Sequence, residues 1–150
     1  MQRIFFSSVL LICLFADASD IKYPVSAIPE NLKKNANVVK RMEESEFEIL
    51  STRETRLHYK YALTILNENG DKYAAFSEYY DQLRHISSVE GYLYDERGNL
   101  IKKMKNKDLA DLSAVDGLID DNRAKEYSFY YRSYPYTVEF EATITWDHTF

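Results

Sequence analysis

Alternation of apolar and polar positions is the strongest pattern in the chain, and two segments show it over long runs. In the first segment the apolar set is Leu57, Tyr59, Tyr61, Leu63 and Ile65, and the polar set is His58, Lys60 and Thr64. In the second the apolar set is Val138, Phe140, Ala142, Ile144 and Trp146, and the polar set is Thr137, Glu139, Glu141, Thr143 and Thr145. Successive side chains of a strand point to opposite faces, so both segments predict strands with one apolar face. Such strands are typical of antiparallel sheets that expose one face to water.

Turn residues divide the rest of the chain into further short strands. Asn69-Gly70 is a typical hairpin turn and predicts a return strand over residues 72–80. A turn at residues 95–99 separates predicted strands over 89–94 and 100–104. Residues 105–122 show no clear period and are expected to form a loop. Two strands over 125–131 and 136–146 then complete the pattern.

One segment near the N-terminus has a helical period instead. Leu32, Asn35, Val39 and Met42 share one helical face. Proline suits the first position of a helix, so a helix is predicted over Pro29–Glu43. The expected fold class is therefore all-β: an antiparallel β-sandwich with one N-terminal helix. Trp146 is still in phase with the core positions only four residues before the end, which predicts a sandwich that is truncated on its C-terminal side.

The first eighteen residues predict export. Arg3 precedes an apolar run over residues 4–15, and Ala16-Asp17-Ala18 has the small residues of a cleavage site. The run is shorter than the roughly 20 apolar residues that span a bilayer, although a retained anchor is the alternative. Residues 1–18 are thus predicted to be a signal peptide and residues 19–150 the β-sandwich module. No membrane span is expected after cleavage.

Composition argues against several functions. A net charge of -5 does not favour nucleic acid as a partner, because phosphate backbones are bound by clustered lysine and arginine. Cys13, the only cysteine, leaves with the signal peptide. The three histidines lack metal-site spacing, and no G-x-S-x-G motif occurs. The chain has 24 acidic residues, so their number leaves a carboxylate pair for glycoside hydrolysis open. Glu139 and Glu141, however, are expected on a solvent-facing strand face, where they provide solubility. We therefore predict no catalytic residue, no metal site, no cofactor and no enzymatic activity.

Two polar clusters are weak candidates for ligand binding. Asp120 and Asp121 offer oxygen ligands for calcium but lack the spacing of a calcium loop; in the simpler interpretation one of them pairs with Arg123 in a solvated loop. Tyr130 and Tyr131 belong to a group of tyrosines around residues 127–136. Tyrosine clusters favour sugar, peptide or protein recognition, and they also pack well in strands.

Several segments together resemble a known family. They are Ile28–Val39, Leu63–Tyr73, Gly91–Asn99, Asp120–Arg123 and Tyr134–Phe140. In order and spacing they are similar to the domain of unknown function that precedes transglutaminase-like domains in exported bacterial proteins. The resemblance implies a β-sandwich in the periplasm, at the cell surface or secreted from a Gram-negative bacterium, beside a papain-like enzyme core. It supplies no catalytic residue for this domain. Relatives continue into further strands and a Cys-His-Asp enzyme domain, which are absent from these 150 residues.

Three functions follow from these observations. The first is an exported, non-catalytic accessory or binding module whose partner is an adjoining transglutaminase-like domain or another exported protein. The second is the N-terminal fragment of a transglutaminase-like peptidase or cross-linking enzyme. The third is a stand-alone carbohydrate- or peptide-binding protein. An incomplete sandwich also predicts self-association, because unpaired strand edges and apolar surface recruit other chains.

Overall fold

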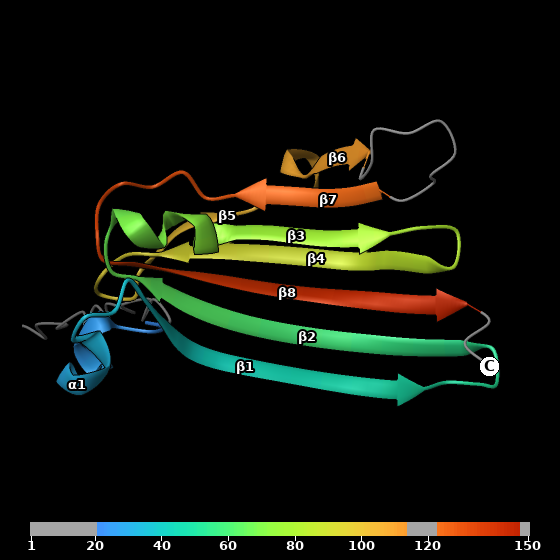
Figure 1. Ribbon diagram of the computed structural model, residues 1–150, viewed down its shortest axis with the longest axis horizontal. Coiled ribbons are helices and arrows are strands. Elements are labelled where there is room, and N and C mark those ends of the chain that lie inside the picture. Colours follow the sequence, from blue (N-terminus) through green and yellow to red (C-terminus); the bar gives the residue numbers. More distant parts are fainter. Residues whose placement is uncertain (1–20, 114–122, 148–150) are drawn as a thin grey trace, which may run out of the picture.

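Two antiparallel sheets form the protein (Figure 1), for which a computed structural model describes residues 21–113 and 123–147. The larger sheet contains, in spatial order, β1 (Val38–Ile49), β2 (Glu54–Ile65), β8 (Tyr136–Asp147), β4 (Arg84–Tyr94) and β5 (Leu100–Lys103). The smaller sheet contains β3 (Ala75–Tyr80), β7 (Arg123–Ser128) and β6 (Ala110–Ser113). The helical segments are α1 (Glu30–Lys33) and the 3₁₀ turns η1 (Val25–Ala27), η2 (Glu68–Ala74) and η3 (Asn106–Asp108). The predicted fold class, an all-β antiparallel sandwich, is confirmed.

Strand β8 is the centre of the larger sheet. It pairs with β2 on one side and β4 on the other over nearly its whole length. The side chains of Val138, Phe140, Ala142 and Ile144 are completely buried, as the alternation predicted. Phe76 of β3 and Phe129, just after β7, pack on Phe140 with ring centroids 5.6 and 5.5 Å away. These contacts between the two sheets form the hydrophobic core.

The helix predicted over Pro29–Glu43 is wrong beyond its first turn. Helix α1 ends at Lys33, Asn35 takes a positive φ of 60°, and β1 begins at Val38. β1 then pairs with β2 from Val38 to Ile49, with a bulge between Lys40 and Met42. Pairing along a whole strand outweighs a weak helical period, because local propensity is worth only tenths of a kcal/mol per residue.

The hairpin predicted at Asn69-Gly70 is also wrong. Asn67 accepts a hydrogen bond from the N–H of Asn69 through its side chain (3.1 Å), and η2 follows in place of a tight turn. The chain thereby crosses to the smaller sheet, where β3 begins at Ala75 and pairs with β7. Gly70 is needed for close packing: a Cβ there would lie 2.6 Å from the backbone oxygen of Asn37.

The second predicted turn, at residues 95–99, is confirmed. It joins β4 to β5, and the Asp95 carboxylate accepts the backbone N–H groups of Arg97 and Asn99 at 2.8 Å each. Gly98 adopts a φ of 90°, which side-chain-bearing residues rarely adopt. The loop predicted over 105–122 is wrong in its first part, which forms η3 and β6; residues 114–122 lie outside the described residues.

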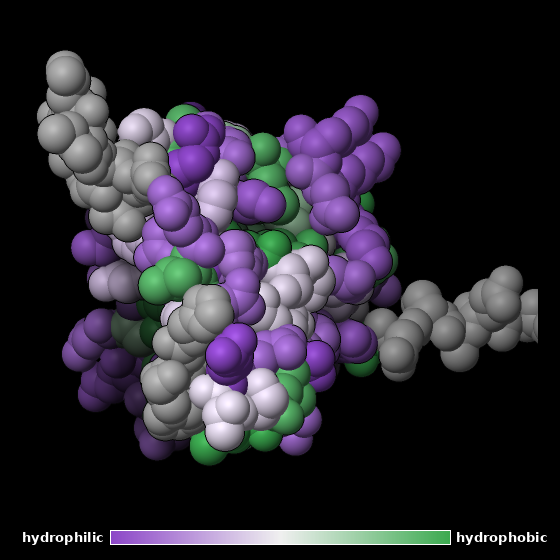
Figure 2. Space-filling model, turned by 90° about the vertical axis from the view of Figure 1, so that its right-hand side faces the viewer, coloured by the Kyte–Doolittle hydropathy of each residue, from purple (hydrophilic) through white to green (hydrophobic). Residues whose placement is uncertain are grey.

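Apolar side chains remain exposed at the end of the sandwich where β1 ends and β4 begins. Phe47, Ile49 and Leu83 are each more than half exposed there. Trp146, expected in the core, is only half-buried and contacts Phe47 and Arg84 instead. Figure 2 shows this end, with hydrophobic residues visible in a hollow between hydrophilic ones. The smaller sheet therefore covers this end of the larger sheet incompletely.

Candidate functional site

Two polar features stand out in the described residues. The first is a buried carboxylate, Glu139, on the face of the larger sheet that points away from the smaller sheet. The second is a cleft between β5 and β7. Of the residues singled out from the sequence, Tyr130 lies in this cleft, and Asp120 and Asp121 lie outside the described residues.

Glu139 is completely buried although it lies on the polar face of β8. The prediction that it is a solvated surface residue is therefore wrong, whereas its place on the polar face is confirmed. Lys60 of β2 places its Nζ atom 2.9 Å from Oε1 of Glu139 and 3.1 Å from Oε2 of Glu141. The Tyr94 hydroxyl donates to Oε2 of Glu139 at 3.2 Å. Hydrogen bonding to Glu139 raises the pKa of Lys60, so the buried carboxylate is neutralised by an ammonium group that stays charged.

The segment that covers Glu139 precedes α1. Tyr23 lies edge-on against Tyr94 with ring centroids 5.7 Å apart, and burial and the Glu139 carboxylate raise the pKa of Tyr23 to about 12. Arg41 holds this segment in place by donating to the backbone oxygens of Tyr23 (2.9 Å) and Pro24 (3.2 Å). The bulge in β1 at Arg41 positions the guanidinium for these bonds. The contacts around Glu139 and Arg41 thus attach the N-terminal segment to the larger sheet, and their role is structural.

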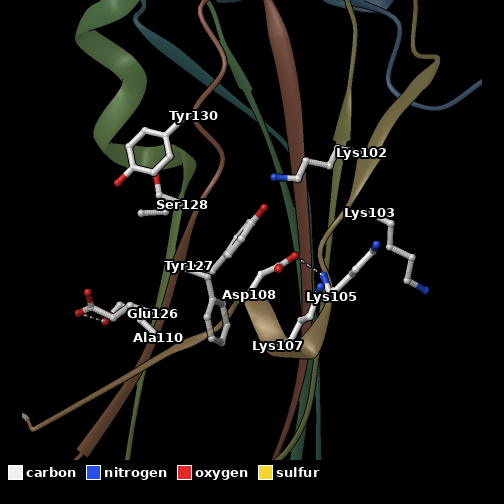
Figure 3. A pocket seen from close by; sticks show the side chains of 13 residues that line it. Lys102, Lys103, Lys105, Lys107, Asp108, Ala110, Glu126, Tyr127, Ser128 and Tyr130 are labelled. Atoms are coloured by element: carbon white, nitrogen blue, oxygen red, sulfur yellow. Dashed lines mark hydrogen bonds between the residues drawn. The ribbon is translucent and has the colours of Figure 1, made fainter.

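The cleft between β5 and β7 has a volume of about 870 Å³. Figure 3 shows lysines from β5 and the following turn on one side, and Glu126, Ser128 and Tyr130 on the other. Its charged lining residues are Lys102, Lys103, Lys105, Lys107, Asp108 and Glu126. The lining thus carries four lysines and two carboxylates in a chain whose net charge is -5. This local excess of positive charge favours an anionic ligand.

The two carboxylates of the cleft already have hydrogen-bond donors. Asp108 accepts the backbone N–H of Lys105 at 3.1 Å, and Glu126 accepts the Ser77 hydroxyl at 3.2 Å. Lys103 points away from the cleft in Figure 3 and pairs with Glu90 at 3.3 Å. Lys105 and Lys107 form no ion pair within the described part of the chain. Their ammonium groups are therefore available to a ligand.

Aromatic residues form the remainder of the cleft. Tyr127 lies between its walls (Figure 3), and a hydrogen bond with its buried hydroxyl raises the pKa of Lys102. Tyr130 is 96% exposed. Exposed and half-buried tyrosines combine a flat apolar surface with a hydroxyl, which suits recognition of another chain. The sequence indicated this tyrosine-rich segment. Lys105 and Lys107 were missed because they lie in a segment that was expected to be a loop, and Lys102 and Lys103 lie in the strand predicted over 100–104 but were not singled out.

Arg123 and Tyr131 are not part of the cleft. Arg123 pairs with Asp111 of β6 at 2.9 Å and contacts the Tyr80 hydroxyl at the same distance. Tyr131 is half-buried and packs edge-on against Tyr136, with centroids 5.5 Å apart. Both side chains therefore serve packing and strand pairing.

Across residues 21–113 and 123–147, no cluster of three or more histidine, cysteine or acidic side chains has the geometry of a metal site. His58 lies 3.2 Å from Glu141, and His85 lies 3.2 Å from Asp147. In the same residues, no helix is long and apolar enough to cross a membrane.

Fold and cleft define an antiparallel β module with a basic, tyrosine-lined cleft. A family model described as a domain of unknown function with solved structures, DUF3857, matches residues 51–150. The chain belongs to this family. No curated protein matches the sequence. The predicted resemblance to a domain of unknown function is confirmed in this form, and its association with a transglutaminase-like domain remains a prediction.

One solved structure shares the fold. It is a protein from Parabacteroides distasonis described as a "putative protease", with a TM-score of 0.62 and 11% sequence identity. The similarity covers 75% of this chain and 23% of that one. The chain thus corresponds to less than a quarter of the length of that protein.

Proposed function

We propose that this chain is a non-catalytic binding module of an exported protein, and that it adjoins an enzyme domain of the transglutaminase-like or peptidase type. The adjoining domain is supported by the similar solved structure, in which this fold occupies 23% of a longer chain described as a protease. Export is supported by the signal-peptide pattern of residues 1–18. The module would hold a substrate or partner near the active site of its neighbour.

The observation that carries the proposal is the contrast between the two polar features. At the buried site, the ammonium group of Lys60 lies within 3.1 Å of both the Glu139 and the Glu141 carboxylates. The open feature is the cleft, and its lining includes lysine, tyrosine and serine side chains suited to binding. A transglutaminase or papain-like reaction needs a thiolate, and the single cysteine, Cys13, lies in the predicted signal peptide.

The proposal is tested with the purified chain lacking residues 1–18. We expect no amine incorporation into glutamine residues of casein and no hydrolysis of casein, while a known transglutaminase and a known protease serve as positive controls. Activity that co-purifies with the chain and disappears in Glu139→Gln or His58→Ala would contradict the proposal. Such a result would favour the alternative that this chain contributes residues to an enzyme.

The adjoining domain is tested at the gene. We expect the reading frame to continue past codon 150 into a domain with cysteine, histidine and aspartate in catalytic order. A stop codon at this point would contradict the adjoining domain and favour a stand-alone carbohydrate- or peptide-binding protein.

A further inference from the structure

We propose that the cleft between β5 and β7 binds an extended peptide rich in acidic residues, which adds to the free edge of β7. This assignment rests on the proposed binding function and names its ligand. Three independent observations lead to it: an open strand edge, a group of lysines beside it, and tyrosines that flank it.

The open edge begins where β6 stops pairing. β6 pairs with β7 only from Arg123 to Glu126, and no described strand continues along that side of β7. The N–H of Phe129 donates to the oxygen of Ala74, toward β3. Because backbone groups alternate sides along an antiparallel strand, the N–H and C=O of Ser128 point to the opposite edge, into the cleft. They offer a peptide the main-chain hydrogen bonds of strand addition.

The lysines give the ligand its charge. Lys102, Lys105 and Lys107 line the wall opposite Ser128, and Figure 3 shows Lys105 and Lys107 near the floor of the cleft and Lys102 above them. Lys102 lies over the ring of Tyr127 at 5.5 Å, which fixes the height of its ammonium group. Side chains on one face of an extended peptide recur about every 6.6 Å. Alternating carboxylates would therefore meet successive ammonium groups.

The tyrosines favour a peptide over an acidic sugar. The buried Tyr127 hydroxyl hydrogen-bonds with the ammonium group of Lys102, which holds that charge beside the Tyr127 ring. Tyr130, exposed at the rim, provides an apolar surface for the side chains that alternate with the acidic ones. A sugar acid would satisfy the lysines but would leave the backbone edge at Ser128 without a partner.

The test is calorimetric titration of the purified chain with a capped hexapeptide of alternating glutamate and valine. We expect saturable binding, and we expect Lys105→Glu/Lys107→Glu to weaken it by about tenfold or more, the equivalent of one lost charged contact. The matched control is Lys34→Glu/Arg53→Glu, which makes the same change in net charge at exposed residues outside the cleft. This control should change the dissociation constant by less than about twofold.

Modified ligands separate edge pairing from simple charge attraction. Two versions of the peptide carry N-methyl groups, one on the odd-numbered amides and the other on the even-numbered amides. The version whose methylated amides face Ser128 should lose about tenfold in affinity, and the other version should retain its affinity. Equal binding of both versions, or equal binding of a glutamine-valine peptide, would overturn the assignment. Binding of an oligoguluronate hexamer without binding of the peptide would overturn it as well.

The same samples distinguish the two proposals. Mass spectrometry should recover the peptide intact after incubation. Cleavage of the peptide would contradict the non-catalytic function, whereas an inactive, folded chain that binds no acidic peptide would overturn only the ligand assignment.

Discussion

The Nζ atom of Lys60 lies 2.9 Å from Oε1 of Glu139, a carboxylate that is completely buried on the central strand of the larger sheet. Removal of one partner from such a pair leaves an uncompensated charge in a site with little water. We expect Lys60→Met to lower the free energy of unfolding by about 3 kcal/mol. The measurement is urea unfolding at neutral pH.

A double variant isolates the pair itself. Lys60→Met/Glu139→Gln should recover part of the lost stability, because the remaining polar group is then uncharged. Lys34→Met, at an exposed lysine, is the control and should leave stability unchanged within about 0.5 kcal/mol. A loss below about 1 kcal/mol in Lys60→Met would show that the pair is not desolvated as the structure indicates.

Gly98 links the β4–β5 turn to the N-terminal segment. A Cβ at this position would lie 2.4 Å from the backbone oxygen of Lys22, and its φ of 90° disfavours a side chain. Gly98→Ala should therefore destabilise the protein by about 2 kcal/mol and loosen residues 21–28. Thermal melting and limited proteolysis measure the two effects, with Glu96→Ala as the control in the same turn. Unchanged melting and unchanged cleavage in Gly98→Ala would refute the link.

The raised pKa of Tyr61 predicts that the protein loses stability at alkaline pH. Burial raises its pKa to about 12, from the value of 10.0 expected in the unfolded chain. The folded state therefore keeps a proton that the unfolded state loses, so stability is full below pH 10 and falls as pH rises toward 12. Tyr61→Phe should match the original protein at pH 8 and exceed it by about 1 kcal/mol at pH 11. The same difference at both pH values would assign the effect to packing.

Exposed apolar side chains at the end of the sandwich predict self-association. Phe47 and Ile49 are 58% and 63% exposed on adjacent positions of one strand face. We expect the chain without residues 1–18 to form dimers or larger species as its concentration rises, and Phe47→Ser/Ile49→Thr to remain monomeric. Size-exclusion chromatography with light scattering provides the measurement. A monodisperse monomer with a sharp, cooperative thermal transition would contradict this prediction.

Export is checked at the N-terminus of the mature protein. Mass spectrometry of the periplasmic or secreted fraction should find a chain that begins at or near Ser19. A species that begins at Met1 in the membrane fraction would show that the apolar run acts as an anchor and not as a cleaved signal.

Local patterns in the sequence determined much of this fold. The alternation over 57–65 and 138–146 placed β2 and β8 correctly and assigned their apolar faces, because the period of two is a property of the strand backbone itself. The turn at residues 95–99 was predictable because the positive φ of its fourth residue, Gly98, favours glycine. The tyrosine-rich segment around Tyr130 was also indicated from composition.

Tertiary structure alone decided the remaining features. Residues 38–43 form a strand and not a helix because they pair with β2 on both sides of the bulge at Arg41. Asn69-Gly70 leads the chain to the second sheet because close packing of Gly70 against Asn37 takes the place of a tight turn. Glu139 is buried because Lys60, Tyr94 and the N-terminal segment converge on it from distant parts of the chain. The cleft exists because β6 is shorter than β7 and leaves Ser128 beside the lysines of β5 and of the turn that follows it. The sequence determines which side chains are present. Their burial and charge pairing depend on which strands are neighbours, and the neighbours are determined by all the strand pairings together.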